Sequence, residues 1–118
     1  MYNTINDHHQ WVLYKKNGTL IIGLTEDALK STGEVYGIVP AHHDERRLNE
    51  AFTHQTGIHI NACDRLCTIR SENGDWNIIS PITGTICGFN WPLVLAYPSP
   101  INQNPYAAWI IKLKPISS

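Results

Sequence analysis

Short segments rich in β-branched and aromatic residues, separated by turn-forming pairs, constrain the fold of this chain more than any other feature. The first two, Trp11–Tyr14 and Thr19–Leu24, are separated by Asn17-Gly18, a pair in which both residues tolerate positive φ. Further strands are expected at 58–60, 65–70, 76–79, 83–87 and 107–114. Many short strands with turn signals between them predict an all-β sandwich or a flattened barrel.

Short helices are expected to interrupt these strands. Thr25 is suited to the N-cap of a helix over 25–32, because two acidic residues follow it and Gly33 can end the helix in the left-handed conformation. A strand near 34–39 should follow, and Pro40 should stop it.

Two further helices are expected, and a proline-rich connection separates the second from the last strand. Apolar residues at i, i+3 and i+4 predict an amphipathic helix over 44–52. Asn90 as a cap and an early proline favour a short helix over 90–96. Three prolines between 98 and 105 predict an extended connection to the final strand.

Size and charge narrow the class of protein. A chain of 118 residues is expected to form one domain, 1–118, with a core that needs neither metal nor disulfide. The net charge of −1 gives no field that would gather nucleic acid, and no apolar run is long enough to span a membrane. Because the N-terminal residues lack a secretory signal and the cysteines are odd in number, we expect reduced, buried thiols and a cytoplasmic protein. These cysteines are Cys63, Cys67 and Cys87.

Several motifs, in order along nearly the whole chain, resemble those of the glycine cleavage H-protein family. His9–Val12 resembles the family's His-Glu-Trp-Val, and Ile22–Ala28 resembles Val-Gly-Ile-Thr-Asp-x-Ala. Near the end, Ser80–Gly84 resembles Ser-Pro-Leu-Ser-Gly, and Trp109–Lys112 resembles Trp-Leu-Ile-Lys. The resemblance implies a mainly β fold with short helices, a flattened hybrid β-barrel or sandwich of the lipoyl/biotinyl-carrier type. It also implies a carrier that depends on one lipoylated lysine at a hairpin tip.

The carrier lysine of that family is missing from this sequence. Counting back from Ser80, the family's Glu-Ser-Val-Lys falls on Arg70-Ser71-Glu72-Asn73, and no lysine lies between Lys30 and Lys112. An asparagine side chain is a non-nucleophilic amide that cannot accept lipoate. We therefore expect no cofactor, no catalytic residue and no enzymatic activity. Asn73-Gly74 suits a type I′ turn, so the tip is either an ordinary hairpin end or a recognition surface.

A second departure from the family pattern is the longer region between Pro40 and Gly57. We interpret residues 41–56 as an inserted segment, which contains His42, His43 and His54. The two histidine pairs of the chain, His8-His9 and His42-His43, are more simply solvated polar pairs than a cluster.

The resulting functional hypothesis is a non-lipoylatable, non-enzymatic module that binds a protein partner, for example an enzyme that docks lipoyl carriers. The partner-binding residues proposed from the sequence are Arg70, Glu72, Asn73 and Trp76. An exposed Trp76 would favour recognition, whereas packing on the 44–52 helix is the alternative. Trp11 and Trp109 lie within apolar segments and are expected in the core.

A small metal-responsive or redox-responsive protein is the other hypothesis. His54, His59, Cys63 and Cys67 are of residue types that ligate zinc. However, if the two cysteines share one strand they are about 13 Å apart, too far for one ion. The sequence therefore predicts core cysteines and surface histidines rather than a metal site.

Overall fold

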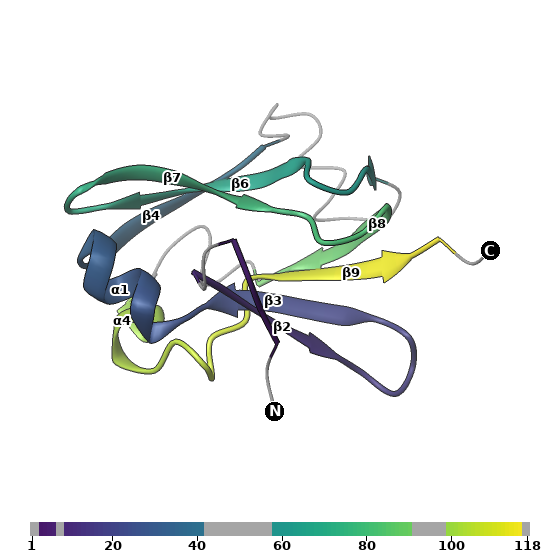
Figure 1. Ribbon diagram of the computed structural model, residues 1–118, viewed down its shortest axis with the longest axis horizontal. Helices are drawn as coiled ribbons and strands as arrows, with labels where there is room; N and C mark the ends of the chain where they lie inside the picture. The colour runs from purple at the N-terminus through teal and green to yellow at the C-terminus, as the bar shows by residue number, and fades with distance from the viewer. Residues whose placement is uncertain (1–2, 7–8, 42–57, 91–98, 117–118) are drawn as a thin grey trace.

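Two antiparallel sheets face each other in the computed structural model, which describes residues 3–6, 9–41, 58–90 and 99–116 (Figure 1). The larger sheet has the strand order β1 (Asn3–Ile5), β2 (Gln10–Tyr14), β3 (Leu20–Leu24), β9 (Ile111–Pro115), β8 (Gly84–Phe89) and β5 (Ile58–Ile60). The smaller sheet has the order β4 (Val35–Pro40), β6 (Arg65–Ser71) and β7 (Gly74–Ile79). The expected mainly β sandwich of the lipoyl-carrier type is confirmed.

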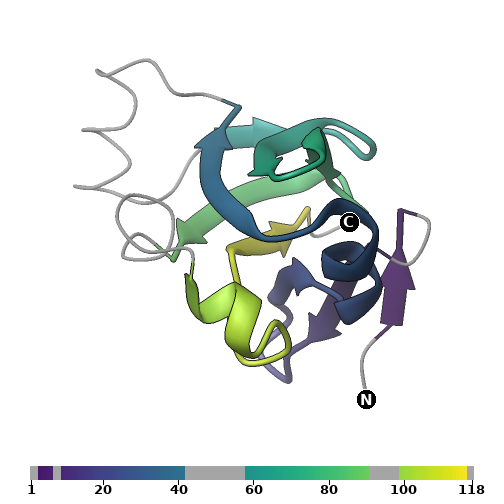
Figure 2. The ribbon, with the colours of Figure 1, turned by 90° about the vertical axis from the view of Figure 1, so that its left-hand side faces the viewer.

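Two short helices, α1 (Glu26–Thr32) and α4 (Ser99–Gln103), lie at one end of the two sheets (Figures 1 and 2). The expectation for α1 is confirmed, because the Thr25 hydroxyl accepts a hydrogen bond from the Ala28 N–H at 3.2 Å. Gly33 ends the helix with φ 81° and ψ −168°, a positive φ but not the left-handed helical conformation expected. No helix in the described segments is long and apolar enough to cross a bilayer.

The core lies between the sheets and draws its apolar side chains from both. Leu20, Ile22 and Leu113 of the larger sheet are fully buried against Ile69 and Ile78 of the smaller one. On β6 and β9 buried and less buried residues alternate over much of the strand, as expected for a sheet with one covered face, whereas all five residues of β3 are buried.

Trp11 is buried on the other face of the larger sheet. It pairs with Gly23 across β2 and β3, and a Cβ atom at Gly23 would overlap its indole ring. The indole N–H donates to the Pro105 carbonyl at 3.0 Å, so the connection after α4 covers the ring. The expected burial of Trp11 is confirmed. Trp109 is only half-buried, because β9 begins at Ile111 and leaves it ahead of the strand, so its assignment to the core is wrong.

Three other expectations differ from the structure or fall outside the described residues. The proline-rich connection is not extended throughout, because it contains α4. Pro100 lies in the first turn of this helix, where its missing N–H costs no helical hydrogen bond. The strand β1 was not anticipated from its polar sequence. The predicted helix over 44–52 and nearly all of the predicted helix over 90–96 lie outside the described residues.

Two side-chain amides join the free edges of the smaller sheet to the rest of the molecule. On β7, the Ile79 N–H donates to Oε1 of Gln10 at 2.9 Å, and Nε2 of Gln10 donates to the Ile79 carbonyl at 3.0 Å. On β4, the Val35 N–H and carbonyl make the equivalent pair of bonds with Asn102, both at 2.9 Å. Each amide thus imitates a neighbouring strand. We call Gln10 and Asn102 the edge amides.

Replacing the fully buried Gln10 by alanine should destabilise the protein by about 2 to 4 kcal/mol, because both polar backbone groups of Ile79 lose their side-chain partner. Chemical denaturation of the purified variants measures this change. Gln103→Ala is the matched control, since Gln103 is exposed and should change stability by less than about 0.5 kcal/mol. Equal losses in the two variants would contradict this role of the edge amide.

Candidate functional site

The hairpin between β6 and β7 places Asn73 at its tip, at the same end of the molecule as α1 (Figure 1). Ser71 pairs with Gly74, so Glu72 and Asn73 are the two central residues of the turn. Neither has a positive φ, whereas Gly74 has φ 128°. The expected type I′ turn at Asn73-Gly74 is therefore wrong, because the residue that needs glycine's freedom comes directly after the turn.

The tip is hydrogen-bonded to the end of α1 and to Glu34, which follows the helix. The Asn73 N–H donates to the Thr32 carbonyl at 3.0 Å, and the Glu72 N–H donates to the Glu34 carbonyl at 3.1 Å. In return, the Glu34 N–H donates to the Glu72 carboxylate at 2.8 Å. Three hydrogen bonds hold the turn, so the position of residue 73 is set by α1 as well as by its own strands.

Arg70 lies on the outward face of the smaller sheet, close behind the tip. Its Nε atom lies 3.8 Å from the Asp75 carboxylate, and both side chains are about half exposed, at 51%. Its guanidinium carbon lies 5.9 Å from the centre of the exposed Tyr36 ring. Tyr36 was not among the residues expected at this site. The outward position of Tyr36 coincides with an irregularity in strand pairing between Val35 and Gly37. Nothing in the sequence pattern marks that irregularity.

Trp76 of β7 lies on the opposite face of the smaller sheet from the paired residues Arg70 and Asp75. Its strand partner is Ile69, a fully buried core residue, and Trp76 itself is half-buried against the core. The rings of Trp76 and His9 meet edge to face, and their centroids are 5.4 Å apart. Trp76 is thus not the exposed aromatic that would have favoured recognition, because strand alternation directs this side chain inward. The 44–52 segment, its alternative partner, lies outside the described residues.

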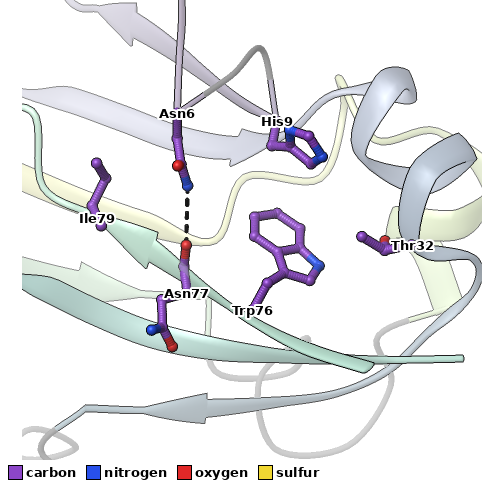
Figure 3. A pocket seen from close by; sticks show the side chains of 6 residues that line it. All are labelled: Asn6, His9, Thr32, Trp76, Asn77 and Ile79. Atoms are coloured by element: carbon purple, nitrogen blue, oxygen red, sulfur yellow. Dashed lines mark hydrogen bonds between the residues drawn. The ribbon is translucent and has the colours of Figure 1, made fainter. Parts of the chain in front are cut away.

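A groove of about 420 Å³ runs between the N-terminal residues and β7, beside the tip (Figure 3). It is lined by Asn6, His9, Thr32, Trp76, Asn77 and Ile79. The Asn6 amide donates to the Asn77 carbonyl at 3.0 Å across it. The lining carries amides, a hydroxyl and two aromatic rings but no carboxylate or permanently charged side chain.

The cysteines lie only in part as expected, because Cys67 is in the core whereas Cys63 and Cys87 are not. Cys63 is exposed in the turn before β6, with φ 73°, whereas Cys67 is buried within β6, so the two do not share a strand. In the parts of the chain that the structure describes, no group of three or more His, Cys, Asp or Glu side chains could hold a metal ion. His59 is exposed on β5, and His54 lies outside those parts, as do His8, His42 and His43.

The facing sheets and the short hairpin define the class of protein, a lipoyl-domain-like β module. A crystal structure of a glycine cleavage system H protein from Mycobacterium marinum superposes on it with a TM-score of 0.73, at 20% identity, over 98% of this chain and 84% of that one. That likeness supports the fold. The family follows from the sequence comparisons.

The model of the glycine cleavage H-protein family matches residues 3–118, so this chain belongs to that family. A probable glycine cleavage system H protein from Pyrococcus furiosus is 30% identical over 108 residues, which is 91% of this chain and 69% of the relative. The H protein of Nitrosospira multiformis is 30% identical over 111 residues, 93% of this chain and 74% of the relative.

Thiol labelling should distinguish the cysteines. Burial raises the pKa of the Cys67 thiol far above its usual range, which disfavours the reactive thiolate in the folded protein. Burial also raises the pKa of Cys87. We expect an aromatic disulfide reagent to label exposed Cys63 first and Cys67 only after unfolding, as read by peptide mass spectrometry. Rapid labelling of Cys67 in the native protein would contradict this assignment.

Proposed function

We propose that this chain is an H-protein-like module that cannot be lipoylated and that acts, without catalysis, by binding a protein partner. The observation that carries the proposal is Asn73, which stands in the turn of the hairpin where the family carries its lysine. The sequence contains no lysine from 31 to 111 that could take the place of the carrier lysine. The scaffold of the carrier is retained while its reactive amine is absent.

The chemical argument concerns the nitrogen at the tip. Attachment of lipoate forms an amide bond and requires a primary amine as nucleophile. The nitrogen of the Asn73 side chain is conjugated with its carbonyl and has no such reactivity.

The proposed partner is an enzyme that docks lipoyl carriers, because such an enzyme has a surface that already accepts this fold. Arg70, Glu72 and Asn73 are exposed together at one end of the molecule, whereas Trp76 contributes from the adjoining groove. Arg70 replaces an acidic residue in the family motif, and a reversed charge at an interface discriminates strongly between partners. The three cysteines are free, which is typical of a reducing compartment and supports a cytoplasmic location.

Incubation with lipoate and a lipoate ligase should leave the mass of this protein unchanged, because no amine is available at position 73. Intact-mass spectrometry detects a lipoyl group directly. The Nitrosospira multiformis H protein, treated in parallel, is the positive control and should gain the group. A lipoyl increment on this chain would overturn the proposal, and peptide mapping would then identify the lysine that carries it.

Binding should depend on the charge of Arg70. We expect at least one purified enzyme of a glycine cleavage system to bind the immobilised protein, and Arg70→Glu to weaken that binding by about tenfold or more, roughly 1.4 kcal/mol. Lys114→Glu makes the same charge change at an exposed residue of β9, in the other sheet, and should leave the affinity unchanged. Equal effects of the two reversals would place the interface elsewhere.

A further inference from the structure

We propose that Asn73 is a site of spontaneous deamidation, so that the hairpin tip gains a carboxylate in water without an enzyme. Asn73 and Gly74 are both exposed, and a Cβ added to Gly74 would meet nothing within 4 Å. Gly74 thus has no side chain to hinder the approach of the Asn73 side chain, and the space that a side chain there would occupy is open. This inference depends only on residues 73 and 74 and does not rest on the proposed function.

The reaction proceeds through a cyclic imide. The backbone nitrogen of Gly74 gives up its proton to solvent base and attacks Cγ of Asn73. A C–N bond forms, the bond from Cγ to Nδ2 breaks, and the amide nitrogen leaves as ammonia. Water then adds to one of the two carbonyls of the five-membered ring. The ring opens to aspartate or, through the other carbonyl, to isoaspartate at position 73, with water as the sole co-reactant and no oxidation or reduction.

The chain contains a second Asn-Gly pair, Asn17-Gly18, whose side chain is restrained. Oδ1 of Asn17 accepts hydrogen bonds from the Thr19 N–H at 3.1 Å and from the Thr19 hydroxyl at 2.6 Å. The Gly18 N–H, the group that would have to attack, donates to the Lys15 carbonyl at 3.1 Å. Ring closure at this pair would have to break these bonds first.

The Asn73 side chain has no comparable restraint. Within the described part of the chain its carboxamide makes no hydrogen bond, and the recorded bond of this residue to α1 uses its backbone N–H. Its Cγ can therefore turn toward the Gly74 nitrogen while the turn remains attached to Thr32. Both glycines lie at the ends of turns, but the asparagine side chain is restrained at position 17 and unrestrained at position 73, so we expect faster deamidation at position 73.

The product would change the surface of the tip. A carboxylate at position 73 would stand between those of Glu72 and Asp75, leaving Arg70 as a single positive charge among three negative ones. Isoaspartate would also add one atom to the main chain within the turn. Either product alters the charge at the end of the molecule that carries Arg70.

The test is incubation of the purified native protein in mildly alkaline buffer at physiological temperature, followed by peptide mass spectrometry over time. The replacement of –NH2 by –OH should accumulate at position 73 several-fold faster than at position 17, and Asn73→Gln should abolish the signal in that peptide. In denaturant the two pairs should convert at similar rates, because Thr19 no longer restrains Asn17. No conversion at position 73, or equal rates at the two positions in the native protein, would overturn the inference.

Discussion

The two-sheet structure depends on how the three-stranded sheet is attached to the six-stranded one. Strands β4 and β7 are the edges of the smaller sheet, and at each of them an edge amide makes a paired hydrogen bond with one backbone residue. Gln10 comes from the first hairpin and Asn102 from α4. An unpaired polar group at a buried sheet edge is costly, so these two side chains fix the sheets in one arrangement.

That arrangement also determines the geometry of the tip. Because β4 follows α1 directly, anchoring β4 through Asn102 places Thr32 and Glu34 where the β6–β7 turn can bond to them. The tip is consequently held on a helix end instead of projecting freely. In a carrier, such a support would fix the starting point of a flexible arm. Here it presents Arg70, Glu72 and the Asn73 carboxamide at a defined position, which suits the recognition surface that we propose.

The elements that follow local rules were predictable from the sequence, and those that depend on distant partners were not. The capped helix after Thr25 and the strands on either side of Asn17-Gly18 agree with expectation, because caps and turns are encoded within a few residues. Trp109 was misjudged, since it lies ahead of its strand, and the sequence left open whether Trp76 is exposed, which its pairing with Ile69 decides by directing it inward. Hydrophobicity alone does not reveal either fact.

The sequence by itself determined the family, the positions of most strands and the absence of a lysine from 31 to 111, because motifs, turn pairs and the identity of a side chain are local chemical facts. Only the tertiary structure decided what surrounds residue 73. The bonds that matter there join residues far apart in the chain, such as Glu34 with Glu72, 38 positions apart, and Gln10 with Ile79, 69 apart. A glutamate or glutamine acquires such a role only when folding brings a particular backbone group within about 3 Å of it.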